Sequence, residues 1–196
     1  MNLDAVELRV LGCLLEKERT TPDQYPLSLN ALRLAANQST NRDPVVDYDE
    51  ATIRTALDRL GNLGYTRLAS GPGSRAAKFR HLLPDALQLD RAQLALLAVL
   101  MLRGPQTAAE LRTRTERLHS FASVPDVEET LRALAARELV RQLTRRPGER
   151  EERWTQLLGE GAEVETVHSQ PATSSLEERV ARLEARLAQL EERFAE

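Results

Sequence analysis

Cysteine and histidine are scarce in this chain of 196 residues, and their scarcity excludes several kinds of site. The single cysteine, Cys13, excludes an intrachain disulfide and a zinc site built on several cysteines. The three histidines, His81, His119 and His168, have no Asp, Glu or Cys at metal-ligand spacing, so we expect each to be solvated or structural. Nucleophile-elbow, phosphate-loop and HExxH motifs are missing as well. The sequence therefore predicts a protein without enzymatic activity and without a metal or other cofactor.

Long hydrophobic runs are also missing. The longest, Leu94–Leu102, has nine residues, whereas about 20 are needed to cross a bilayer. Asp4 and Glu7 interrupt the N-terminal segment, and no basic stretch precedes an apolar one as it would in a secretory signal. These features predict a cytoplasmic protein that makes no membrane contact.

Aromatic residues make up only 4% of the chain, which leaves few platforms on which single-stranded nucleic acid could stack its bases. The net charge of −3 is unevenly distributed: residues 1–89 hold 11 basic and 11 acidic side chains, residues 90–158 hold 12 and 10, and residues 159–196 hold 4 and 9. The part before residue 159 is thus slightly basic and the tail acidic. This balance is compatible with nucleic-acid binding but weaker than that of most dedicated binders.

The segment Asp47–Leu82 gives the main indication of the fold. Apolar residues at helical spacing predict a helix that Asp47 caps at its start and Gly64 ends. Two strand-like runs follow, Tyr65–Ser70 and Ala77–Leu82, joined by a Gly-Pro-Gly-Ser turn. A helix that leads directly into a hairpin with a basic tip is typical of the DNA-contacting part of a winged-helix domain.

Two further helices are expected before this segment, over Leu3–Lys17 and about Leu29–Asn37. The polar loop NQSTNRDPVV, residues 37–46, then connects the second helix to the third. Two interpretations of this loop stay open. In the first, Arg42 and Asp43 cap and pin the third helix; in the second, Asn37, Asn41 and Arg42 form a small recognition surface beside it.

The same order of elements repeats from Leu89 onwards. Apolar residues of the first helix recur at an offset of 86 and those of the third helix at an offset of 74, because the first copy has a longer connection between them. A second hairpin is expected over Leu139–Thr144 and Glu151–Leu157. The predicted fold class is mainly α with small β-hairpins (α+β): two tandem winged-helix domains, residues 1–86 and 87–158, a flexible linker, residues 159–174, and a coiled-coil helix, residues 175–196.

The strings TTPDQYPLSLNAL, NQSTNRDPV and LRGPQTAAELRTR resemble those of the YceH family of bacterial proteins. The resemblance extends from Leu3 to about Leu158, with a similar heptad helix at the C-terminus. It implies two tandem winged-helix domains. It implies no particular activity, because the function of the family is unassigned.

Basic side chains gather on both predicted hairpins. Residues 64–83 contain four of them and no acidic side chain, and such a hairpin can lie along the phosphate backbone of DNA. The second hairpin is also basic, although three glutamates dilute its charge. The candidate DNA contacts are Arg42, Arg54, Arg59, Arg67, Arg75, Lys78, Arg80, Arg141, Arg145, Arg146 and Arg150.

The third helix of each copy fits this function less well. The outward face of the first presents Asp58 and Asn62, and the corresponding helix of the second copy is net acidic. A helix that reads the major groove usually presents Arg, Lys, Asn or Gln. The sequence therefore favours binding of duplex DNA with modest sequence specificity. The alternative is a scaffold that binds a protein partner and makes no direct contact with nucleic acid.

The segment 175–196 has apolar residues at heptad spacing. Arginines occupy the g positions beside this seam and glutamates the e positions, so a parallel pair is attractive and an antiparallel pair repulsive. We therefore expect a parallel homodimer held by Leu176, Val180, Leu183, Leu187, Leu190 and Phe194.

Overall fold

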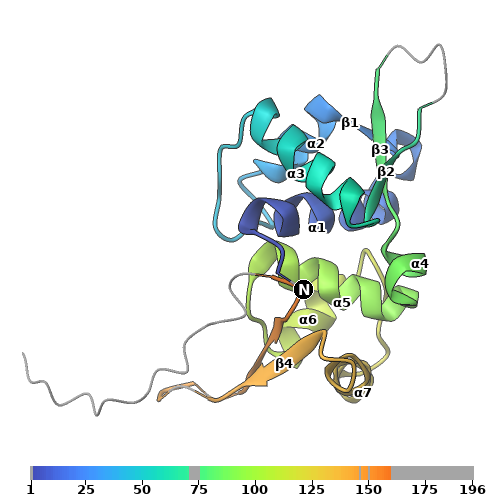
Figure 1. Ribbon diagram of the computed structural model, residues 1–196. Helices are drawn as coiled ribbons and strands as arrows, with labels where there is room; N and C mark the ends of the chain where they lie inside the picture. Colours follow the sequence, from blue (N-terminus) through green and yellow to red (C-terminus); the bar gives the residue numbers. More distant parts are fainter. Residues whose placement is uncertain (1, 71–75, 146, 150, 160–196) are drawn as a thin grey trace, which may run out of the picture. The chain divides into compact units, whose positions relative to one another are not determined.

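The computed structural model describes residues 2–70, 76–145, 147–149 and 151–159. This part contains seven α-helices and two small antiparallel sheets, so the fold is α+β as predicted (Figure 1). No helix among these residues is long and apolar enough to span a bilayer. The predicted linker and coiled-coil helix lie outside the described residues, apart from Gly159.

The first half of the described chain is a group of helices that leads into a three-stranded sheet of order β1-β3-β2. Strand β1 comes before the hairpin in sequence and pairs with its second strand, with Leu27 opposite Phe79. The elements are α1 (Ala5–Thr20), the 3-10 turn η1 (Pro22–Gln24), β1 (Leu27–Ser28), α2 (Leu29–Ala36), α3 (Glu50–Asn62), β2 (Thr66–Leu68), β3 (Lys78–His81) and the short α4 (Leu83–Leu87).

The second half repeats the order of three helices followed by a hairpin. Helix α5 begins 86 residues after α1, and α7 begins 74 residues after α3, in agreement with the two predicted offsets. Both hairpins are somewhat shorter than predicted, because only their central residues pair across the ladder. The elements are α5 (Arg91–Arg103), α6 (Ala108–Thr115), α7 (Val124–Ala135), β4 (Val140–Leu143) and β5 (Arg153–Gln156).

A side-chain cap fixes the start of α1. The Asp4 carboxylate accepts a hydrogen bond from the Glu7 N–H, and the Glu7 carboxylate accepts one from the Asp4 N–H, each at 2.8 Å. The helix therefore begins at Ala5 and not, as predicted, at Leu3. Leu3 instead runs beside the end of the second half, where its N–H donates to the Leu158 carbonyl at 3.0 Å.

Helix α3 also begins later than predicted, because Asp49 and not Asp47 is its cap. The Asn37 side chain holds the preceding backbone extended by binding both polar groups of Tyr48, accepting from its N–H at 2.9 Å and donating to its carbonyl at 2.8 Å. The other end of α3 is as predicted: Gly64 has a φ of +75°, which glycine adopts without strain.

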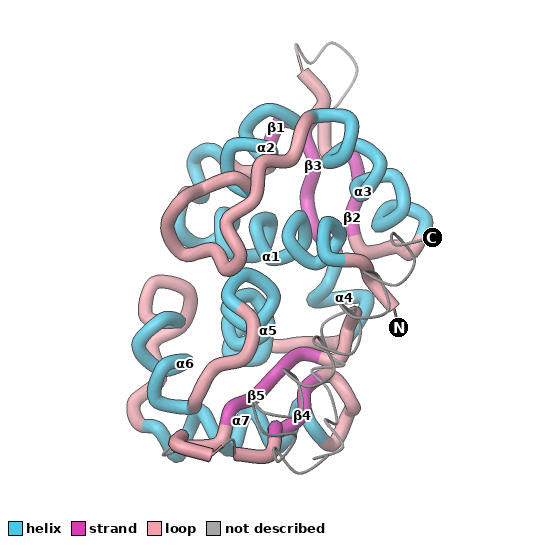
Figure 2. Tube along the Cα trace, turned by 90° about the vertical axis from the view of Figure 1, so that its left-hand side faces the viewer, coloured by secondary structure: helices cyan, strands magenta, loops and turns pink. Residues whose placement is uncertain are grey.

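The two halves share one apolar core, and helices α1 and α5 form its centre (Figure 2). Gly12 lies where these helices meet. A Cβ atom added to it would lie 2.9 Å from Leu102 Cγ and 3.2 Å from Met101 Cβ, so only glycine permits this close approach.

Candidate nucleic-acid interface

The first hairpin places cations next to each other on its ladder. Arg67 of β2 lies directly opposite Arg80 of β3 in the antiparallel register. Like charges in this arrangement repel. Lys78 is exposed on β3, two residues from Arg80. The described residues of the hairpin therefore hold an excess of positive charge that no acidic residue of the hairpin offsets.

The candidate contacts of the first half divide into two groups. Within the described part of the chain, the exposed side chains of Arg54, Arg67 and Lys78 have no carboxylate within ion-pair distance and are available to a ligand. Arg59 is exposed too, but its Nη1 lies 2.9 Å from Asp4 Oδ2. Arg80 is only half-exposed. The predicted contact Arg75 lies outside the described residues.

Arg42 is wrongly predicted as a DNA contact, because its side chain is completely buried. All five of its N–H groups donate within the protein, two of them to the Glu16 carboxylate at 2.6 and 3.1 Å and one to the Ala35 carbonyl at 3.0 Å. Burial alone would lower the pKa of Arg42, but the Glu16 carboxylate raises it overall. Arg42 does not cap α3 either, since it binds groups on α1, α2 and its own loop.

The polar loop between α2 and α3 is held by a second buried arginine, which was not predicted from the sequence. Arg9 of α1 donates to the Pro44 carbonyl at 2.7 Å and to the Ala36 carbonyl at 3.1 Å. Burial lowers the pKa of Arg9. The one available signal is its position inside the apolar run Leu8–Leu11, where an exposed cation would not be expected.

A buried cluster holds the base of the first hairpin against α1. His81 of β3 is 2% exposed, and its Nε2 lies 3.1 Å from Glu18 Oε2. The Tyr25 hydroxyl accepts a hydrogen bond from the His81 N–H at 2.9 Å. The contact with His81 lowers the pKa of the Glu18 carboxyl, although burial opposes this effect. His81 is therefore buried where β3 meets α1 and is not solvated.

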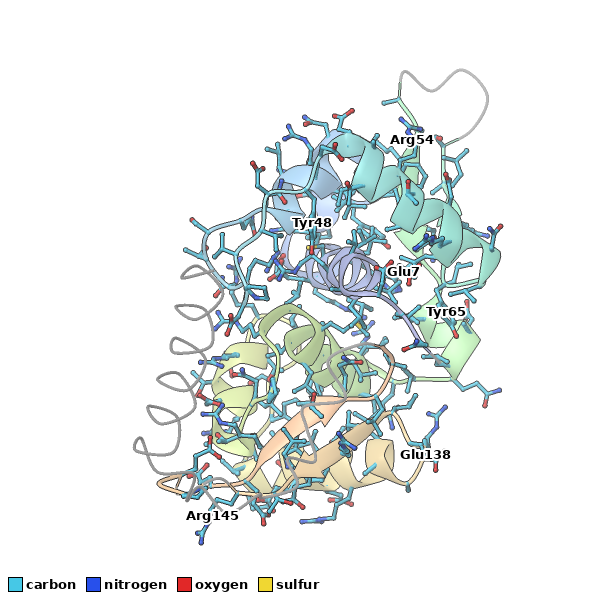
Figure 3. All side chains as sticks on the ribbon, turned by 60° about the vertical axis from the view of Figure 1, so that its left-hand side comes forward. Glu7, Tyr48, Arg54, Tyr65, Glu138 and Arg145 are labelled. Atoms are coloured by element: carbon cyan, nitrogen blue, oxygen red, sulfur yellow. The ribbon has the colours of Figure 1, made fainter. Side chains whose placement is uncertain are left out.

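The second hairpin and α7 offer fewer free cations than the first hairpin and α3. Arg153 of β5 lies 2.9 Å from Glu110 and 3.5 Å from Glu149, and Arg132 of α7 lies 3.2 Å from Glu128. Arg145 is exposed, Arg141 is half-buried, and the predicted contacts Arg146 and Arg150 lie outside the described residues. In space, Arg54 lies at the same end of the described part as the first hairpin, and Arg145 lies at the opposite end (Figure 3).

A cleft of about 850 Å³ lies between α6, α7 and the second hairpin. The Ala108, Val124 and Trp154 side chains contribute its apolar lining, and Glu128 and Arg145 are among its charged residues. In the first half, a smaller cleft of about 330 Å³ borders α3 and the start of α1. The two halves thus present different surfaces in spite of their common order of elements.

Metal and thiol chemistry have little support in the described ranges. They contain no group of three His, Cys, Asp or Glu residues that could hold a metal ion. Cys13 is completely buried, and burial raises the pKa of its thiol to about 11, so the reactive thiolate form is scarce at neutral pH. The residues predicted to form the dimer seam, 176–194, lie outside the part that the structure describes.

A family model described as a protein of unknown function, DUF480, matches residues 3–149. Proteins similar to this chain, each named UPF0502 protein, occur in Shewanella amazonensis, Opitutus terrae and Geotalea uraniireducens and are 50%, 49% and 53% identical to it. The matches cover 93%, 86% and 81% of this chain and 94%, 75% and 73% of these relatives. They confirm the family resemblance seen in the three sequence strings.

Proposed function

Since the chain belongs to the DUF480 family of proteins of unknown function, we propose from its own geometry that it is a non-enzymatic protein that binds duplex DNA through its first hairpin and α3. The single observation that carries this proposal is the set of exposed cations without a carboxylate partner, Arg54, Arg67 and Lys78, on these two adjacent elements. A phosphate backbone would neutralise them and relieve the repulsion between Arg67 and Arg80.

The proposal includes the assignment of each half as a winged-helix domain. A winged-helix domain has three helices followed by a hairpin, and a short early strand pairs with the second strand of that hairpin. In the first half, β1 pairs with β3 in this way. In the second half the bridge between Gln106 and Trp154 occupies the corresponding position. In such a domain the third helix and the hairpin contact DNA together.

Sequence specificity is expected to be modest. The outward side chains of α3 include Thr55, Asp58 and Asn62, of which only Asn62 is a common reader of base edges, and Asp58 repels phosphates. Contacts with the phosphate backbone of the DNA therefore supply most of the affinity. Such contacts make the affinity strongly dependent on salt and nearly independent of the DNA sequence.

Fluorescence anisotropy with two duplexes of unrelated sequence tests this proposal. Replacing both Arg67 and Lys78 by alanine should weaken binding to both duplexes by about tenfold and reduce the salt slope by about 2 units. The matched control replaces Arg91 and Arg117, two exposed arginines away from the hairpin, and removes the same charge. If the wild type does not bind at micromolar concentration in low salt, or if the control loses as much affinity, the proposal is wrong.

The cleft of the second half supports an alternative, the docking of a protein partner. Its lining combines apolar side chains such as Val124 and Trp154 with the carboxylates of Glu128, Glu151 and Glu152, which suit a polar peptide and would repel the phosphates of DNA. A photo-crosslinking amino acid at the exposed Ala109 in the cleft, compared with one at Arg117, tests this function in cells. A discrete adduct that forms only from residue 109, together with no DNA binding, would favour the alternative.

We also propose that the chain is a parallel homodimer held by the seam from Leu176 to Phe194. The sorting of arginine and glutamate onto opposite sides of this seam supports it. A dimer would present two copies of the first hairpin to one duplex and so raise the avidity for DNA.

A further inference from the structure

A polar cavity of about 300 Å³ lies where the loop between α2 and α3 meets the second half. The loop contributes Asn41 and Asp43, and α5 and α6 contribute Arg103 and Arg114. These residues belong to NQSTNRDPV and LRGPQTAAELRTR, two of the three strings on which the family resemblance rests. Neither string has a role in the proposed DNA contact, so the cavity requires a separate explanation.

The arginines of this cavity differ in how completely their N–H groups are used. Arg42 has no free N–H group, and Arg153 binds Glu110 at 2.9 Å and the Pro105 carbonyl at 3.1 Å. Arg103 and Arg114 are different. Arg103 donates to the side-chain oxygen of Asn41, a neutral group, and among the described residues it has no carboxylate partner.

Arg114 is held only weakly. Its Nη2 lies 3.6 Å from Glu110 Oε1, beyond hydrogen-bond distance, and the other oxygen of this carboxylate already accepts from Arg153 and from the Thr107 N–H. Both Arg103 and Arg114 are partly exposed, so their free N–H groups are open to a ligand.

The cations of the cavity act on one another. Burial lowers the pKa of Arg103, and the charges of Arg114 and Arg42 lower it further, ahead of the opposing effects of Glu16 and Asp43. Asp43 lines the cavity too, but it forms no ion pair with a described residue. An anion bound between the two guanidinium groups would relieve this repulsion.

We propose that this cavity, the Arg103–Arg114 pocket, binds a phosphate group, either as inorganic phosphate or as the phosphomonoester of a small metabolite. Each guanidinium group can donate two parallel hydrogen bonds to two oxygens of one phosphate, and a doubly charged tetrahedral anion uses two such forks better than a single carboxylate does. The volume is ample for a phosphate with a small organic group. The ligand would join the loop of the first half to the second half, and it would thereby stabilise the packing of the two.

Thermal unfolding of the full chain near neutral pH tests the proposal, with inorganic phosphate as the probe and chloride at equal ionic strength as the reference. A ligand with millimolar affinity should raise Tm by roughly 4 °C at about 10 mM phosphate. Arg103→Gln with Arg114→Gln should abolish this rise. Arg117→Gln, an exposed arginine later in the same region, should retain it. Acetate should raise Tm much less than phosphate, because it carries one charge and two oxygens.

Glycerol phosphate at the same concentration distinguishes the two sources of the phosphate group. A rise in Tm larger than that with inorganic phosphate indicates a phosphorylated metabolite, and a smaller rise in Tm indicates the free ion. The proposal is overturned if phosphate leaves the wild-type Tm unchanged, or if the Arg103/Arg114 variant responds as the wild type does. It is also overturned if only a DNA duplex stabilises the chain through these arginines, which would assign them to the DNA interface. Since DNA binding is tested at Arg67 and Lys78, failure of either proposal leaves the other intact.

Discussion

Two buried arginines, Arg9 and Arg42, hold the loop between α2 and α3 against α1. Their side chains replace water with backbone carbonyls, the Glu16 carboxylate and the side-chain oxygen of Gln38. Arg42 has a partner for each of its N–H groups, whereas the buried Nε of Arg9 has none among the described residues. A buried cation is tolerated where such partners surround it, and each partner is then costly to remove. These residues therefore act on stability and not on ligand contact.

Replacing Arg42 by alanine should destabilise the protein by about 3–5 kcal/mol, because it leaves the Glu16 carboxylate without its close partner. Chemical unfolding measures the difference. Arg54→Ala is the control, since this side chain is exposed and free, and it should change stability by no more than about 0.5 kcal/mol. Equal stability of Arg42→Ala and the wild type would contradict the buried ion pair.

The contact between Glu18 and His81 predicts a pH dependence. The pKa of the Glu18 carboxyl is lowered in the folded protein, from an ordinary value of 4.5, so the unfolded chain binds its proton more readily. Glu18 thus contributes stability that is present above pH 4.5 and lost as the pH falls through the folded pKa. Glu18→Gln should be less stable than the wild type near neutral pH, and the difference should shrink on acidification. Urea unfolding at a series of pH values measures it; a difference that grows in acid would contradict the lowered pKa.

At the scale of single elements, the close approach of α1 and α5 depends on Gly12. Gly12→Ala should cost about 1–3 kcal/mol, because the new methyl group meets Leu102 and Met101 inside a packed core. Gly61→Ala is a matched control in α3. The added Cβ atom would have no neighbour closer than 3.9 Å. Because alanine forms helices better than glycine, this substitution should raise the free energy of unfolding by about 1 kcal/mol. Thermal unfolding should therefore move in opposite directions for the two variants.

Most elements of the fold could be predicted from the sequence because their causes are local. Apolar spacing located the helices, and caps made by neighbouring residues, such as the capping box of Thr107 and Glu110, set where they begin. Gly64 ends α3 for the same local reason. The pairing of β1 with β3 was not predicted, because its partners Leu27 and Phe79 are far apart in sequence and β1 has only two residues.

The candidate site was less predictable, because the availability of a cation depends on distant groups. Arg42 and Arg67 look alike in sequence, yet one is buried against Glu16 and the other is free. Arg59 is bound by Asp4, 55 residues away. No local pattern encodes such pairs, so a count of basic residues overestimates the number of cations that are available to a ligand.

Over the whole described part of the chain, the two halves repeat the order of helices and strands but not the distribution of charged side chains. On the hairpins and third helices, the free cations Arg54, Arg67 and Lys78 belong to the first half, whereas the second half pairs Arg132 and Arg153 with its own acids. DNA binding by a single chain would therefore depend on one hairpin. One such contact is weak at physiological salt, so a second copy of the chain would strengthen binding considerably.

The last prediction concerns this second copy. In a parallel pair of C-terminal helices, Arg179 faces Glu184 and Arg186 faces Glu191 of the other chain, whereas an antiparallel pair would bring like charges together. Replacing Leu183 and Leu190 by aspartate puts charges into the apolar seam and should convert the dimer into a monomer in light scattering. The control replaces Ala181 and Ala188 by aspartate, at b positions outside the seam, and should remain dimeric.

The same variants connect the oligomeric state to DNA binding. If the dimer supplies avidity, the Leu183/Leu190 variant should bind a long duplex at least tenfold more weakly than the wild type, although its hairpin is intact. A duplex that accommodates only one hairpin should bind both proteins equally. If the mass of this variant equals that of the wild type, the seam is not the dimer contact, and any loss of affinity then has another cause.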